Sequence, residues 1–101
     1  MKTQYACISG TDVSITSQNQ DPVGGDISPN GQEILLKTYD YILYWKRESE
    51  ENLSNTFKRS GIRLPYTREM QGEAICWSVS GNSFYTLSEG KNRTLWLHER
   101  L

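Results

Sequence analysis

The chain has 101 residues, 36% of them hydrophobic and 11% aromatic, and its 11 basic and 12 acidic residues leave a formal charge of −1. This balance gives no field that gathers phosphates, which disfavours nucleic acid and anionic membrane surfaces as partners. No run approaches the roughly 20 apolar residues of a membrane span, and we expect no signal peptide in this chain because its first residues lack an apolar core. Aromatic and β-branched residues punctuated by Gly, Ser and Asn favour an all-β fold.

The first half of the chain predicts short strands separated by tight turns. Residues 11–16 alternate polar and apolar side chains, which is the pattern of a half-buried strand. A short buried strand follows around Ile27, and residues 28–31 form a tight turn in which Gly supplies a positive φ. Residues 33–39 and 41–47 then form a hairpin. An antiparallel meander of three strands is therefore expected.

The second half repeats this order after a polar connection. Residues 48–60 are mostly polar and charged, and we expect an exposed loop with at most one helical turn. Residues 61–66 predict an edge strand, because Pro65 cannot donate to a ladder. The remaining strands are expected around Trp77 and over residues 83–88 and 94–100.

The two halves are copies of one repeat. Residues 26–38 align with residues 76–88 at a constant offset of 50, with Ser and Gly identical at the turn and apolar residues facing apolar ones. After a three-residue insertion the offset becomes 53, and residues 42–47 align with residues 95–100. Two independent stretches thus align in the same order, which indicates a repeat architecture.

The first turn also carries a family resemblance. Asp26-Ile27-Ser28-Pro29-Asn30-Gly31, followed by Ile34-Leu35-Leu36, resembles the Ser-Pro-Asp-Gly turn of TolB-like and WD-like β-propeller repeats, with Asn30 in place of the usual Asp. A family of mostly extracellular propeller proteins is similar over three further segments, which are residues 36–40, 64–75 and 88–90. The resemblance covers about residues 23–100. It implies a propeller fold, which hosts enzymes, lectins and scaffolds alike.

As propeller blades, the repeats predict an assembly. Within one unit, residues 1–101, we expect two four-stranded antiparallel blades, residues 23–70 and residues 71–101, the second of which lacks its outer strand. A strand from residues 1–22 of a neighbouring copy would complete that blade and remove an exposed edge. Because rings have roughly 4 to 8 blades, we expect a head-to-tail homo-oligomer, with a trimer preferred. The alternative is an excised piece of a longer propeller.

The cysteines and sequons bear on the cellular compartment. Cys7 and Cys76 predict two buried thiols, with a single bridge between them as the alternative. Sequons at Asn52 and Asn92 suit a secreted parent protein whose signal peptide lies outside this chain. We therefore expect an extracellular location.

Classical catalytic motifs are missing from the sequence. It holds no nucleophile elbow, P-loop, zinc-protease or EF-hand pattern, and its one histidine, His98, is expected to pack or lie at the surface. Without paired Cys and His spacings a structural zinc site is not expected either. We predict that the protein is not an enzyme and needs no cofactor.

Acidic residues form one candidate site. Asp26, Glu73 and Glu89 adjoin first strands or a hairpin, and three carboxylates repeated around a ring could bind a cation. The favoured alternative is that Glu73 and Glu89 cap backbone amides or pair with two basic residues, Lys37 and Arg93. We accordingly predict no metal.

Aromatic side chains next to amides form a second candidate site. Trp77 and Trp96 are expected to fill the wedge between blades, whereas hairpin tyrosines can stack on a sugar, with Asn92 or Asn82 bonding its hydroxyls. We predict a non-enzymatic, lectin-like binding module for a glycan or a protein. A purely structural assembly role is the alternative, and a metal-dependent enzyme is the least favoured. The predicted ligand-binding residues are Tyr39, Tyr41, Glu73, Glu89 and Asn92.

Overall fold

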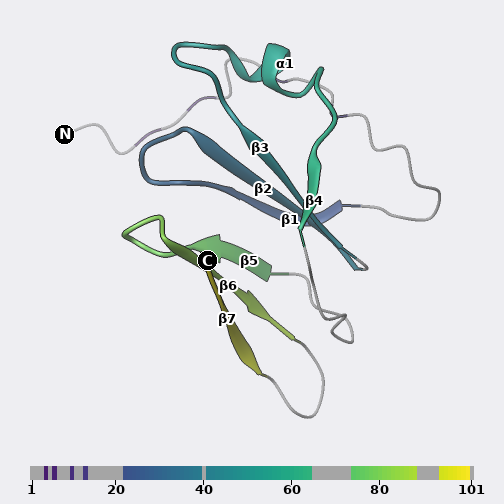
Figure 1. Ribbon diagram of the computed structural model, residues 1–101, viewed down its shortest axis with the longest axis vertical. Coiled ribbons are helices and arrows are strands. Elements are labelled where there is room, and N and C mark those ends of the chain that lie inside the picture. Colours follow the sequence, from purple (N-terminus) through teal and green to yellow (C-terminus); the bar gives the residue numbers. More distant parts are fainter. Residues whose placement is uncertain are drawn as a thin grey trace.

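The strands form two antiparallel sheets, as Figure 1 shows for the computed structural model. The structure describes residues 22–39, 41–64, 74–88 and 94–100, together with Gln4, Ala6, Gly10 and Val13. Sheet 1 contains, in spatial and chain order, β1 (Pro22–Ile27), β2 (Glu33–Thr38), β3 (Ile42–Lys46) and β4 (Ile62–Leu64). Sheet 2 contains β5 (Ala74–Trp77), β6 (Ser83–Leu87) and β7 (Leu95–Glu99), and the one helical turn is α1 (Leu53–Thr56).

The all-β prediction is confirmed, and the expected meander order is present in both sheets. The predicted N-terminal strand at residues 11–16 lies outside the described residues, apart from Val13. None of the described residues belongs to a helix long and apolar enough to cross a membrane.

The sequence repeat is matched hydrogen bond by hydrogen bond at the first turn of each sheet. Gly31 and Gly81 have φ angles of 76° and 77°, which only Gly adopts at little cost. The Ser28 hydroxyl accepts from the Glu33 amide at 3.0 Å, and the Ser78 hydroxyl accepts from the Ser83 amide at 3.3 Å. The two turns therefore have one conformation.

The strand register follows the same offsets. Ile34 pairs with Trp45 in sheet 1, and Phe84 pairs with His98 in sheet 2. Ile34 and Phe84 are 50 residues apart, and Trp45 and His98 are 53 residues apart, as the sequence alignment requires.

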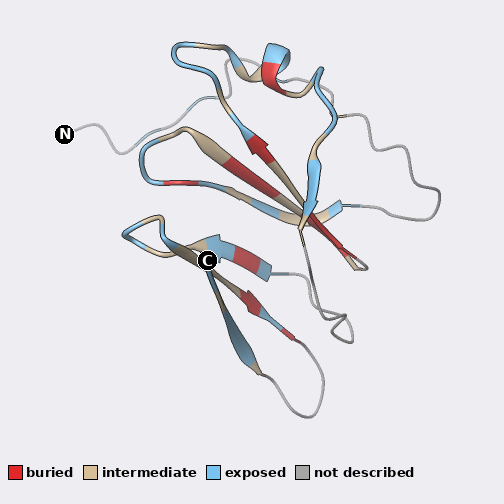
Figure 2. Cartoon of the chain, viewed as in Figure 1, coloured by how far each residue is buried: buried red, intermediate tan, exposed pale blue. Residues whose placement is uncertain are grey.

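The core lies between the sheets. Leu35 and Ile42 of sheet 1 are fully buried and pack with Ile75 of sheet 2. The sheets come closest at β1 and β5 (Figure 1), and Figure 2 shows buried stretches along β2 and β3 but mostly exposed positions along β7. Sheet 1 is thus the better covered of the two.

Two expectations about individual side chains fail. Trp77 packs against the core cluster as expected, but Trp96 is 48% exposed and does not fill the wedge, because β7 extends beyond the cover of sheet 1. Cys76 is exposed with a free thiol rather than buried, since it lies on the face of β5 that points away from Ile75 and the core. Cys7 lies outside the described residues.

The connection between β3 and β4 is more ordered than predicted. It contains one helical turn, α1, but Thr56 is fully buried and Phe57 meets the Trp45 ring edge-on at 5.1 Å. The Asn52 side chain caps the turn by accepting from the Asn55 amide at 2.9 Å. This segment therefore covers part of one face of sheet 1.

Candidate functional site

A groove of about 510 Å³ separates the outer parts of the two sheets. We call it the inter-sheet groove. Its volume lies within the range of roughly 300–1,000 Å³ common for small-molecule sites, which are mostly apolar with a few polar groups. Its lining residues come from β3 and β4 on one side and from sheet 2 on the other, and they are Tyr44, Leu64, Trp77, Asn82, Ser83, Phe84, His98, Glu99 and Arg100.

Three rings from sheet 2 form one wall of the inter-sheet groove. Trp77, Phe84 and His98 stand at paired positions on β5, β6 and β7, so their side chains project from the same face. The Trp77 and Phe84 rings meet edge to face with centroids 5.9 Å apart, and the Phe84 and His98 rings are stacked at 4.7 Å. His98 also forms a 2.9 Å hydrogen bond with the Thr86 hydroxyl. All three rings are half-buried, so the wall is fixed but partly open.

A charged triad joins the sheets next to this wall. The Glu33 carboxylate of β2 accepts from the Tyr44 hydroxyl at 2.6 Å and from the Arg100 guanidinium at 2.7 Å. Arg100 follows β7, so this ion pair joins sheet 1 to the end of sheet 2. The side chain of Glu33 is only 15% exposed, which strengthens its interaction with both donors.

The triad keeps its protonation states near neutral pH. Burial alone would raise the pKa of Glu33, but hydrogen bonds from Tyr44 and Arg100 and the charges of Arg100 and Lys46 outweigh it, so that pKa is lowered. Burial and the hydrogen bond to Glu33 raise the pKa of Tyr44. The same carboxylate raises the pKa of Arg100. The triad therefore consists of a carboxylate, a phenol and a guanidinium, and its Tyr44 and Arg100 line the groove, whereas Glu33 does not.

A second, polar hollow of about 650 Å³ adjoins the groove at the turn end of the sheets. It is lined by both first turns and by the end of β3, and it shares Asn82 and Arg100 with the inter-sheet groove. The backbone amide of Asn82 donates to the Ser80 hydroxyl at 3.3 Å, while the side chain of Asn82 is exposed. Apolar and polar surfaces therefore meet at Asn82 and Arg100.

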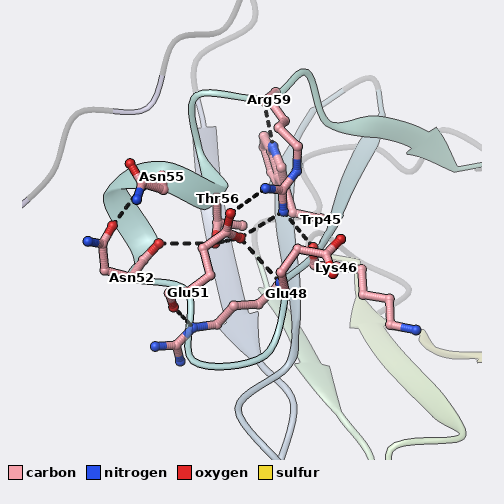
Figure 3. A network of polar contacts seen from close by, with 9 residues as sticks. Trp45, Lys46, Glu48, Glu51, Asn52, Asn55, Thr56 and Arg59 are labelled. Carbon is pink, nitrogen blue, oxygen red and sulfur yellow. Dashed lines mark hydrogen bonds and ion pairs between the residues drawn. The ribbon is translucent and has the colours of Figure 1, made fainter.

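A separate polar network lies at the connection between β3 and β4 and serves to hold this loop. Figure 3 shows Glu51 between Arg59 and Thr56, with bonds of 2.5 and 2.9 Å from the guanidinium and 2.7 Å from the hydroxyl. The Arg59 carbonyl accepts from Trp45 Nε1 at 2.9 Å, and its guanidinium donates to the Lys46 carbonyl at 2.7 Å. Hydrogen bonds from Arg59 and Thr56 lower the pKa of Glu51 to about 2. These groups bond one another, so the network fixes the loop over Trp45.

Of the predicted ligand-binding residues, the two that the structure describes, Tyr39 and Tyr41, do not line the inter-sheet groove. Tyr39 is half-buried just after β2. Tyr41 is only 4% exposed, and the Arg63 guanidinium lies 4.5 Å above its ring centroid, so one face of that ring is already occupied. The other three lie outside the described residues, namely Glu73, Glu89 and Asn92.

The candidate cation site depends on Asp26, which has another role. One oxygen of its carboxylate accepts from the Ile27 amide at 2.9 Å and the other from the Trp77 amide at 2.7 Å. Its supposed partners Glu73 and Glu89 lie outside the described residues. Within the described ranges, no three His, Cys, Asp or Glu side chains gather closely enough to hold a metal ion.

Sequence reasoning missed Glu33, Tyr44 and Arg100 as parts of a site. Their positions in the repeat carry the signal that was available. Arg100 aligns with Arg47, but Glu33 and Tyr44 align with Ser83 and Leu97, so a charged pair is specific to the contact of these two sheets.

Comparisons with protein-family models, with curated proteins and with solved structures find no significant match to this chain. No activity or ligand is therefore transferred from another protein. The inter-sheet groove itself is what points to a function.

Proposed function

We propose that the chain is a non-enzymatic binding module on a propeller-type scaffold and that a glycan binds in the inter-sheet groove. The observation that carries the proposal is the paired row of Trp77, Phe84 and His98 beside polar groups of Asn82 and Arg100. Aromatic faces suit the C–H faces of a sugar ring, and amide and guanidinium donors suit its hydroxyls. A mostly apolar hollow with a few polar groups is the usual form of such sites.

The charge states of the triad beside the groove favour binding over acid–base catalysis. A general acid or base works best with a pKa near the operating pH. The pKa of Glu33 is lowered and that of Tyr44 is raised, so both move away from neutrality. Their mutual hydrogen bond and the contact with Arg100 orient them as fixed hydrogen-bonding groups.

The scaffold proposal is supported by the repeat itself. Two meanders share their turn geometry and register, and they approach each other at their first strands, β1 and β5, as adjacent propeller blades would. Completion of β7 by an N-terminal strand of another copy, in a trimeric head-to-tail ring, is part of this proposal.

A glycan array probed with the wild type and with groove variants tests the proposal. Asn82→Ala removes an exposed side chain shared by both hollows, and His98→Ala removes one ring of the wall. We expect each to weaken binding to the selected glycan by about tenfold or more, which corresponds to about 1.4 kcal/mol. Asn55→Ala, at an exposed position of α1 away from both hollows, is the matched control and should bind normally.

Two results would contradict the proposal. The first is no binding by the wild type to any glycan on the array. The second is binding that survives both groove substitutions but is lost in Tyr39→Ala, which would place the ligand at the β2–β3 hairpin instead.

A structural assembly role is the second candidate function. The observation that favours it is the exposed apolar surface of β7, where Leu95, Trp96 and Leu97 are all exposed. Large exposed apolar patches on soluble proteins mark interaction surfaces.

A further inference from the structure

Sheet 2 has one face that faces the core and one that does not. Side chains alternate between the faces of a strand, and Trp77, Phe84 and His98 point into the groove. The residues between them project from the opposite face, which we call the outer face of sheet 2. Its members are Ala74, Cys76, Ser83, Tyr85, Leu87, Leu95, Leu97 and Glu99.

The outer face of sheet 2 is mostly apolar and open. Leu95 is 64% exposed and Leu97 is 51% exposed, and Leu87 and Cys76 are exposed as well. Glu99, at the end of β7, is the only acidic or basic residue among its eight members. β7 is also an edge strand, hydrogen-bonded in the described residues to β6 alone. Such a surface on a soluble protein calls for a partner.

The repeat identifies what kind of surface covers this face. Through the two offsets, Tyr85 and Leu95 correspond to Leu35 and Ile42 of sheet 1. Leu35 and Ile42 are fully buried because Ile75 and its neighbours on sheet 2 pack against them. Inside one chain, the face of sheet 1 that corresponds to the outer face of sheet 2 is thus covered by the groove side of sheet 2.

A second copy of the chain offers one part of the matching surface, on β1. In sheet 1 the positions of Trp77, Phe84 and His98 are held by Ile27, Ile34 and Trp45. Two of these side chains are buried within their own chain: Trp45, which packs against Phe57, and Ile34. The third, Ile27 on β1, is 42% exposed. The two sheets of one chain meet mainly at β1 and β5. The repeat therefore requires that β5 of one copy meets β1 of the next copy, and the exposed Ile27 lies on β1.

We propose that the outer face of sheet 2 docks on the Ile27 side of sheet 1 in a second copy of this chain. The contact repeats between chains the packing that joins the two sheets within a chain, and it rests on the proposed propeller-type scaffold. It is head-to-tail, since two different surfaces meet, and such contacts close into rings or extend into filaments. Leu97 and Ile27 mark its two sides.

Light scattering with mass determination on the full chain, over a range of concentrations, tests this contact. We expect the wild type to have the mass of a closed ring, three chains of 11.6 kDa each being the preferred number. Leu97→Glu and Ile27→Glu should each give monomers. Mixing these two variants should restore a species of two chains, because one junction then retains both native sides. Val79→Glu, at a 95% exposed turn position outside both surfaces, is the control and should assemble like the wild type.

Each remaining outcome overturns the contact. A wild type that stays at 11.6 kDa at every concentration removes it. Assembly lost in Leu97→Glu but normal in Ile27→Glu indicates that two outer faces pack together, and failure of the mixed variants to form pairs excludes the head-to-tail arrangement. Circular dichroism verifies that each variant is folded, and Leu95→Glu replaces Leu97→Glu if the latter is not. Asn82→Ala should assemble normally, so loss of glycan binding and loss of assembly are separable.

Discussion

The carboxylate of Asp26 in β1 accepts a 2.7 Å hydrogen bond from the backbone amide of Trp77 in β5. This bond joins the two sheets at the strands where they come closest. The residue at the position of Asp26 in sheet 2 is Cys76, whose thiol is exposed and free. The repeat therefore contains a polar link between its two copies that the sequence of the second copy does not reproduce.

Replacing Asp26 with Ala should destabilise the fold by about 1.5–3 kcal/mol, the usual contribution of a hydrogen bond to a charged group. The physical reason is that the Trp77 amide loses its acceptor where the sheets meet. Urea denaturation measures the loss. Asp26→Asn keeps an oxygen at this position and should cost less, so equal effects of the two substitutions would contradict the role of the hydrogen bond.

Alanine at Gly31 and at Gly81 should destabilise the protein by similar amounts. Both residues have positive φ, 76° and 77°, and a Cβ would meet nothing closer than 3.9 Å at either position. The cost is therefore conformational, about 1–2 kcal/mol each. Gly10→Ala, where a Cβ also meets nothing within 4 Å, is the control and should have little effect in the same denaturation experiment. Clearly unequal losses would mean that the two turns are not equivalent.

Local signals explain why the repeat was predictable from the sequence and the groove was not. Turn glycines and alternating apolar residues fix strands and register within about 25 residues, so Gly31 and Gly81 could be aligned directly. The ion pair of Glu33 and Arg100 spans 67 residues and depends on how two finished sheets pack. Trp96 was misjudged for the same reason, because only the packing decides how far β7 extends beyond the cover of sheet 1.

Alanine at Gly61 should disturb the covered face of sheet 1. Its Cβ would lie 2.7 Å from Trp45 Cζ2, so the indole must shift, and a shift disturbs its contact with Phe57 and its hydrogen bond to the Arg59 carbonyl. Overpacking of this kind costs about 1–3 kcal/mol. Urea denaturation should show the loss, with Gly10→Ala again as the control. A Gly61→Ala protein as stable as the wild type would contradict the tight packing of Gly61 on Trp45.

The Glu51 network makes stability depend on acid. The folded-state pKa of Glu51 is about 2, below its ordinary value of 4.5, because Arg59 and Thr56 hydrogen-bond to the ionised carboxylate. A lowered carboxyl pKa contributes stability that is complete above the ordinary pKa and is lost as the pH falls toward the folded-state value.

Melting temperatures of the wild type and of Glu51→Gln, measured from pH 7 downward, should therefore differ most at neutral pH. They should converge between about pH 4.5 and pH 2, because over this range the carboxyl takes up its proton more readily in the unfolded chain than in the folded one, which removes the stabilisation. Glu50→Gln, at the exposed position next to Glu51, is the control and should keep the acid profile of the wild type. A difference between the wild type and Glu51→Gln that stays constant with pH would show that ionisation of Glu51 does not stabilise the loop.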